Sequence, residues 1–102
     1  MKFIIIYITH KNMREAKKVA SHLLGKRLIA CVNYFPIQSS YWWKGKIESN
    51  KEIVTLVKTK KANWKKVQNE VKKIHPYETP CIMKLEVEAD VDYAEWINKE
   101  TK

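Results

Sequence analysis

The chain has 102 residues, of which 45% are apolar and 11% aromatic, with two glycines and three prolines. This composition predicts one globular domain spanning residues 1–102 and excludes a disordered chain or long flexible linkers. The formal net charge is +9, and it is unevenly distributed: residues 1–77 carry 17 basic and 4 acidic side chains, net +13, whereas residues 78–102 carry 3 and 7, net −4.

The N-terminal segment is a β-branched and aromatic run that predicts a buried first strand over residues 2–9. Its six apolar residues, Phe3 to Ile8, are too few for a signal peptide or a membrane span. Cys31 and Cys81 are isolated, which fits a reducing compartment better than a disulfide scaffold. We therefore expect a cytoplasmic protein with no membrane partner.

A first helix is predicted next, because Asn12-x-x-Glu15 resembles a capping box. Apolar residues then recur at three- and four-residue spacing, which indicates one core-facing stripe ending near Gly25. The stripe consists of Met13, Ala16, Ala20, Leu23 and Leu24.

A long β-hairpin is predicted over residues 28–59. Its first arm covers residues 28–34 and 37–43, and Pro36, which cannot donate to a ladder, indicates a bulge or an exposed edge. Lys44-Gly45 is a turn signal, and residues 47–59 form the second arm. Trp42 and Trp43 should face opposite sides of the sheet, so only one can easily enter the domain's own core. The other is either an interface anchor or a partly exposed tryptophan.

The C-terminal half predicts a helix, a strand and a last short helix. The second helix should end at His75, because Pro76 follows. Alternation from Cys81 to Ala89 predicts a half-buried strand with Cys81 on its core face. Asp92-x-x-Glu95 is expected to cap the last helix. The apolar stripe of the second helix is Trp64, Val67, Val71 and Ile74, and that of the last is Tyr93, Trp96 and Ile97.

The element order is thus β-α-β-β-α-β with an added C-terminal helix. This order is typical of the ferredoxin-like fold, an α+β sandwich with a split βαβ arrangement and an antiparallel sheet. One sheet face stays bare in such a domain unless a partner covers it.

The segment His75-Pro76-Tyr77-Glu78-Thr79-Pro80 places an imidazole, a phenol and a carboxylate between two prolines, and Cys81 follows directly. Imidazole, carboxylate and thiolate at i, i+3 and i+6 suit copper or zinc. The alternative is a rigid helix-to-strand connector whose histidine lies at a helix C-terminus, where positive charge is favourable. The spacing leaves both interpretations open.

Three segments together resemble the CutA family of divalent-cation tolerance proteins. They are Arg27-Leu28-Ile29-Ala30-Cys31-Val32-Asn33, Tyr41-Trp42-Trp43-Lys44-Gly45-Lys46-Ile47-Glu48 and His75-Pro76-Tyr77-Glu78-Thr79-Pro80. The resemblance covers nearly the whole chain. It implies a ferredoxin-like subunit in a tight homotrimer, similar in build to PII-type signalling proteins, with intersubunit clefts lined by the motif residues.

The resemblance also implies a role in tolerance of copper and other divalent metals. Residue by residue, it makes Cys31, His75 and Glu78 the metal candidates, with copper as the expected ion and zinc as a further one. Cys81 occupies a position where the family commonly has a residue that binds no metal.

Two other functional classes find little support. An enzyme is not expected, because the chain has no Gly-x-Ser-x-Gly elbow, P-loop or dinucleotide fingerprint. A basic β-α-β-β-α-β domain also resembles an RNA-recognition motif, but Lys44-Gly45-Lys46-Ile47 has lysine and isoleucine where stacking aromatics are needed. We therefore expect no sequence-specific nucleic-acid binding, and only salt-sensitive adhesion to polyanions.

The favoured prediction is a trimeric, copper-linked divalent-cation tolerance protein. The alternative is a PII-like sensor of small molecules, or a scaffold without a metal role, in which the side chains of residues 75–78 form an internal lock between subunits.

Overall fold

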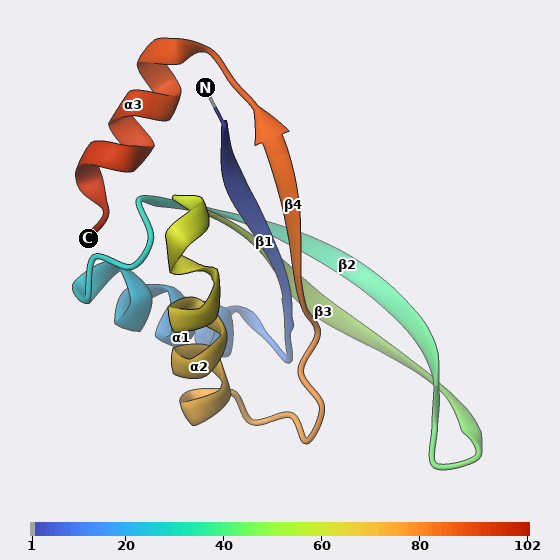
Figure 1. The fold of residues 1–102 in the computed structure, drawn as a ribbon. Coiled ribbons are helices and arrows are strands. Elements are labelled where there is room, and N and C mark those ends of the chain that lie inside the picture. The colour runs from blue at the N-terminus through green and yellow to red at the C-terminus, as the bar shows by residue number, and fades with distance from the viewer. Residues whose placement is uncertain (1) are drawn as a thin grey trace.

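The computed structural model describes residues 2–102 and has the predicted order of elements (Figure 1). The elements are β1 (Lys2–His10), α1 (Met13–Gly25), β2 (Cys31–Trp43), β3 (Lys46–Thr59), the 3₁₀ turn η1 (Lys61–Asn63), α2 (Trp64–Ile74), β4 (Ile82–Glu88) and α3 (Val91–Glu100). Within residues 2–102, none of the helices is both long and apolar enough to cross a membrane.

The four strands form one sheet in the order β2-β3-β1-β4, and every neighbouring pair is antiparallel. Helices α1 and α2 lie together on one face of this sheet (Figure 1). The ferredoxin-like prediction is therefore confirmed. Helix α3 packs at one end of the sheet, where Ala94 and Ile97 bury Phe3 of β1.

The main core lies between the sheet and the helix pair. Strand β1 contributes every second residue of its continuous apolar run, because alternate side chains of a strand point to the same face. The face that carries these residues is completely buried under the helices. The helices contribute residues at three- and four-residue spacing. The central members are Ile4, Ile6, Ile8, Val19, Leu23, Val67 and Val71, each at most 1% exposed.

Local chain signals set the ends of α1 and of the hairpin. The Asn12 side-chain oxygen accepts a hydrogen bond from the Glu15 backbone N–H at 2.9 Å, as a helix N-cap does. Helix α1 ends at Gly25, and the left-handed residue that follows is Arg27, with φ of 56°. Lys44 and Gly45 both have positive φ, which matches the type I′ turns that join tightly twisted strands.

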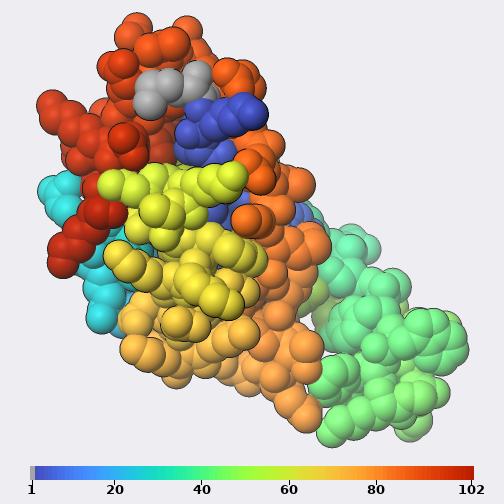
Figure 2. All heavy atoms as spheres, viewed as in Figure 1, coloured from blue at the N-terminus to red at the C-terminus, as the bar shows by residue number. Residues whose placement is uncertain are grey.

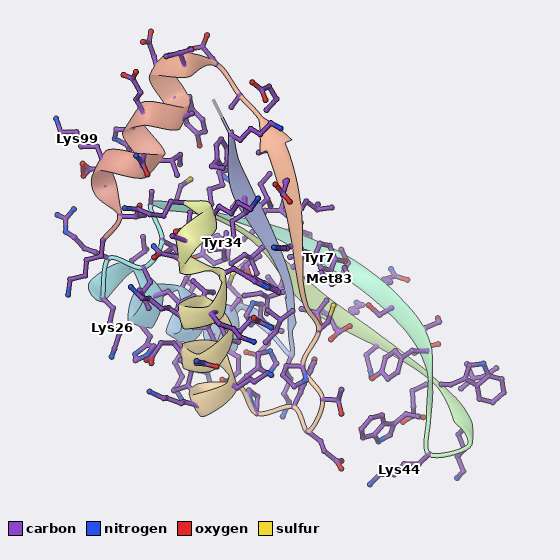
Figure 3. The ribbon with its side chains drawn as sticks, viewed as in Figure 1. Tyr7, Lys26, Tyr34, Lys44, Met83 and Lys99 are labelled. Atoms are coloured by element: carbon purple, nitrogen blue, oxygen red, sulfur yellow. The ribbon has the colours of Figure 1, made fainter. Side chains whose placement is uncertain are left out.

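Strand β4 corrects one prediction. Met83 and Leu85 lie on the sheet face opposite α1 and α2, and they are 51% and 55% exposed. Met83 pairs with Tyr7 on that face (Figure 3). The residue of β4 that packs against the main core is Ile82. The expected core face is thus divided: Val87 and Ala89 pack against the Phe3 cluster under α3, whereas the part around Met83 and Leu85 is uncovered in the single chain, because no helix lies over it. Cys81 precedes the strand and is half-buried.

The hairpin extends well beyond the helices (Figures 1 and 2). Trp42 is 72% exposed and Trp43 is 39% exposed. The expectation that one of them enters the domain's core is therefore wrong, because the projecting arms have no second layer to pack against. Strand β2 is an edge strand, and its pairing with β3 runs through Pro36 without interruption, so the edge interpretation holds and the bulge does not.

The last helix begins earlier than predicted. The Asp90 carboxylate accepts from the Asp92 backbone N–H at 3.2 Å, which makes Asp90 the N-cap of α3. The predicted cap at Asp92 is thus displaced by two residues, since two acidic residues close together in the sequence compete for the role.

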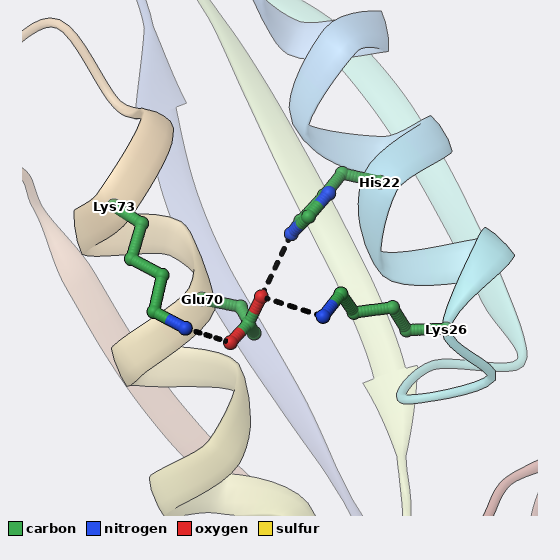
Figure 4. Close-up of polar contacts among 4 residues, drawn as sticks. All are labelled: His22, Lys26, Glu70 and Lys73. Carbon is green, nitrogen blue, oxygen red and sulfur yellow. Dashed lines mark hydrogen bonds and ion pairs between the residues drawn. The ribbon is translucent and has the colours of Figure 1, made fainter.

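A polar clamp joins α1 to α2 on the outer side of the helix pair (Figure 4). The Glu70 carboxylate of α2 lies 2.8 Å from His22 Nε2 and 3.3 Å from Lys26 Nζ, and it is 2.7 Å from Lys73 Nζ on its own helix. The hydrogen bond from Lys73, followed by the one from His22, lowers the pKa of Glu70 to about 2.

We predict that this clamp stabilises the fold in a pH-dependent way. Because the folded pKa of Glu70 lies below its ordinary value of 4.5, its contribution is present above pH 4.5 and is lost as the pH falls through about 2. Glu70→Gln should therefore lower the urea midpoint at pH 7, where three cationic or polar donors lose their anion. The gap between variant and wild type should close near pH 2.

The control for this prediction is Glu95→Gln, which removes an exposed carboxylate from α3. This substitution should leave the urea midpoint nearly unchanged at both pH values. A Glu70→Gln gap that is equally wide at pH 7 and at pH 2 would contradict the assigned charge effect.

Candidate functional site

His75 ends α2 and turns the chain toward β4. Its backbone is extended, with φ of −77° and ψ of 130°, because Pro76 follows and disfavours helix. Its Nε2 lies 2.8 Å from the backbone oxygen of Thr9, and the Tyr77 backbone N–H donates to its Nδ1 at 3.2 Å. A carbonyl oxygen only accepts, so the hydrogen is on Nε2. Both ring nitrogens of His75 are therefore used within the chain.

A second imidazole lies against the first. The rings of His10 and His75 are stacked with 5.3 Å between centroids, and His10 is completely buried. His10 Nε2 lies 2.8 Å from the Thr55 hydroxyl, and its Nδ1 has no hydrogen-bond partner among the described residues. Burial, with a smaller contribution from His75, lowers the pKa of His10 to about 4. The pair joins the ends of β1 and α2 to β3.

Tyr77 continues this network to β3. Its hydroxyl donates to Glu52 Oε2 at 2.6 Å, and Glu52 is only 7% exposed. Burial, followed by the hydrogen bond to Glu52, raises the pKa of Tyr77, so the phenol stays protonated. Sequence reasoning missed Glu52. The available signal was an acidic residue directly before the apolar run at residues 53–57, on the same strand face as Val54.

A groove with a volume of about 1080 Å³ separates the base of the hairpin from the segment after α2. In Figure 2 the hairpin lies beside this segment. Burial, with the charge of Glu52, raises the pKa of the Cys81 thiol, so this cysteine is a poor thiolate donor. The lining residues are Thr9, Lys11, Gln38, Ser39, Ser40, Tyr41, Trp43, Asn50, Lys51, Glu52, Pro76, Tyr77, Glu78, Thr79 and Cys81.

The three predicted metal residues do not meet within one chain. Glu78 lines the groove, whereas Cys31 begins β2 opposite Lys58, which itself pairs with Ile5. The Thr9 carbonyl that holds His75 is four residues further along β1, about 13 Å at strand spacing. Cys31 packs instead against the Phe3 cluster under α3. No group of three or more metal-binding side chains exists within residues 2–102. A shared site would need Cys31 from another chain.

The fold and this site define a class of protein: a ferredoxin-like domain with a partly uncovered sheet face, a projecting hairpin, and a groove between the hairpin's base and the segment after α2. The model of one family, CutA1 divalent ion tolerance protein, matches residues 4–100. The chain therefore belongs to the CutA1 divalent-cation tolerance family.

Relatives agree over nearly the full length. The chain is 44% identical to the divalent-cation tolerance protein CutA of Archaeoglobus fulgidus over 95 residues, covering 92% of this chain and 93% of that protein. Its structure is similar to the crystal structure of CutA1 from Pyrococcus horikoshii, with a TM-score of 0.95, 39% identity and coverage of 98% and 99%. The Thermus thermophilus CutA1 structure gives a TM-score of 0.93 at 34% identity, with both chains fully covered.

Proposed function

We propose that the protein acts as a homotrimer in tolerance of divalent cations, in a binding role and not as an enzyme. The observation that carries this proposal is the match to the divalent-cation tolerance family over residues 4–100. The exposed apolar surface of the single chain supports trimer formation, because soluble monomers rarely expose a large continuous apolar surface. Exposed apolar residues on the open sheet face and hairpin, outside the groove, are Phe35, Trp42, Ile47, Met83 and Leu85.

We further propose that the assembly binds copper, or zinc, through Cys31, His75 and Glu78. Thiolate and imidazole donors favour these ions over calcium and magnesium, which need more oxygen ligands. Because Cys31 lies far from His75 within one chain, the ion would sit between subunits. Its binding would also require His75 Nδ1 to release the Tyr77 N–H.

Copper titration of the purified assembly by calorimetry tests this ligand set. Cys31→Ser, His75→Ala and Glu78→Gln should each weaken copper binding, because each removes one donor atom. Cys81→Ser should have a smaller effect, and His22→Ala, on the outer clamp, should have none. Unchanged stoichiometry and affinity in the Cys31 and His75 double variant would contradict the proposed site.

A scaffold without a metal role is the second candidate, and a specific observation favours it. Both nitrogens of His75 are already bonded, and its ring is stacked on His10. Such a histidine fixes the 75–80 segment whether or not metal is present. The Cys31 and His75 double variant separates the two functions. If the protein is a scaffold, any copper binding should be the same in this variant as in wild type.

We also propose a cytoplasmic location, based on two cysteines that are free in the structure. Relatives are named with other compartments: an Archaeoglobus fulgidus structure is described as periplasmic and an Oryza sativa protein as chloroplastic. Fractionation of the source cells, with detection by antibody, tests the location.

A further inference from the structure

Glu52 is a buried carboxylate without a cationic partner. Its Oε2 accepts from Tyr77, and within residues 2–102 no other hydrogen bond or ion pair reaches this side chain. Lys11 and Lys51 line the same groove, yet neither pairs with it. An unpaired buried charge is costly, and buried carboxylates in proteins are normally paired. The second oxygen of Glu52 is thus available to a ligand in the groove.

Three of the side chains that line the groove with this carboxylate are aromatic. Tyr41 and Trp43 come from β2 and Tyr77 from the opposite side of the groove. The Asn50 side-chain N–H donates to the Tyr41 hydroxyl, which helps to fix that ring. Aromatic faces attract cations through their quadrupole, and a carboxylate beside aromatic faces is the arrangement that recognises organic ammonium groups.

We propose that this groove binds a small organic ammonium compound, with Glu52 as its counter-ion and Tyr41, Trp43 and Tyr77 as its aromatic wall. A free anion is disfavoured by the charge of Glu52. Glu52 and Glu78 are the carboxylates that line the groove, and no group of three or more metal-binding side chains exists within residues 2–102, so the groove suits a hard metal ion less well. Lys11 and Lys51 are exposed, so solvent and salt screen their repulsion more than they screen the buried carboxylate.

This site shares only Glu78 with the proposed metal site, so the two can be tested separately. Neither Cys31 nor His75 lines the groove, and no ammonium contact requires a bound metal. Failure of copper binding would therefore leave this inference intact, and the reverse also holds. Cys31→Ser, which is expected to weaken copper binding, should leave ammonium binding unchanged.

The experiment is calorimetric titration of the purified assembly with methylammonium, tetramethylammonium and 1,4-diaminobutane. It uses phosphate buffer, which contains no amine, and a chelator that removes metal ions. At least one probe should saturate at one site per chain. Glu52→Gln keeps the shape and an acceptor for Tyr77 but removes the charge, so binding of that probe should weaken by about tenfold or more.

The matched control is Glu48→Gln, which removes an exposed carboxylate from the same strand, four residues away and outside the groove. This variant should bind like wild type. Equal weakening in Glu48→Gln and Glu52→Gln would indicate general charge attraction and overturn the proposal, as would the absence of saturation for all three probes at millimolar concentration.

Trp43→Ala keeps the proposal testable if Glu52→Gln disturbs folding, which circular dichroism would reveal. Trp43 lies outside the domain's core, so the single chain should fold without it. Its loss removes one aromatic wall and should weaken the same probe. Wild-type affinity in a folded Trp43→Ala variant would contradict the aromatic recognition.

Discussion

Replacing Leu85 with glutamate is expected to dissociate the proposed trimer into folded single chains. Leu85 lies on β4, pairs with Ile5 and is 55% exposed on the sheet face that no helix covers. In a trimer that buries this face, the new carboxylate would be desolvated without a partner. Such a charge costs about 3 kcal/mol or more per site. The single chain, in which residue 85 faces water, should tolerate it.

Light scattering on the eluted peak measures this effect directly. Wild type should give three times the 12.1 kDa subunit mass, and Leu85→Glu should give the subunit mass with unchanged far-ultraviolet circular dichroism. Leu24→Glu is the matched control, because Leu24 is also an exposed leucine but lies on α1, on the other side of the sheet. Dissociation by both variants, or by neither, would contradict the assignment of the open face as the interface.

The order of elements could be predicted because periodicity and chain-breaking residues agree along this sequence. The stripe from Trp64 to Ile74 ends where Pro76 requires it to end, and the Lys44-Gly45 turn adopts the two positive φ angles that a tight hairpin needs. These signals act between residues that are close in the sequence, so tertiary context did not override them.

The faces of the elements were harder to predict than their positions. An alternating strand such as β4 has one apolar face, but alternation cannot say whether that face packs against the chain's own helices or against another subunit. The apolar pattern around Leu85 and Trp42 therefore overstates the core within the chain. Apolar residues at an oligomer interface and in a core give the same pattern.

The candidate site was only partly visible in the sequence. His75, Tyr77 and Glu78 were found because the two prolines draw attention to them. Glu52 and His10 are distant in sequence and carry no motif, and only the pairing of β1 with β3 brings them to the same place. The predicted metal ligands failed for a different reason. Cys31 belongs to a segment that resembles the family, but it lies at the end of β2 that is far from His75, so the two residues cannot share a site within one chain.

His75→Ala is expected to destabilise the fold whether or not metal is present. The substitution leaves the Thr9 carbonyl and the Tyr77 N–H without their partners, and it opens a cavity beside the buried ring of His10. Unpaired buried groups and a cavity of this kind together cost about 3 kcal/mol. Guanidinium unfolding in the presence of a chelator should show this loss. An unchanged midpoint would mean that His75 does not lock the segment.

His75→Asn separates the structural role of this histidine from a metal-binding role. The asparagine side-chain oxygen can still accept from the Tyr77 N–H, because it sits close to the position of Nδ1, so part of the lost stability should return. A neutral amide is a much weaker copper ligand than an imidazole. If His75 binds copper, His75→Asn should recover stability but not copper affinity. If both His75 variants bind copper like wild type while His75→Ala is unstable, then His75 fixes the 75–80 segment and does not bind copper.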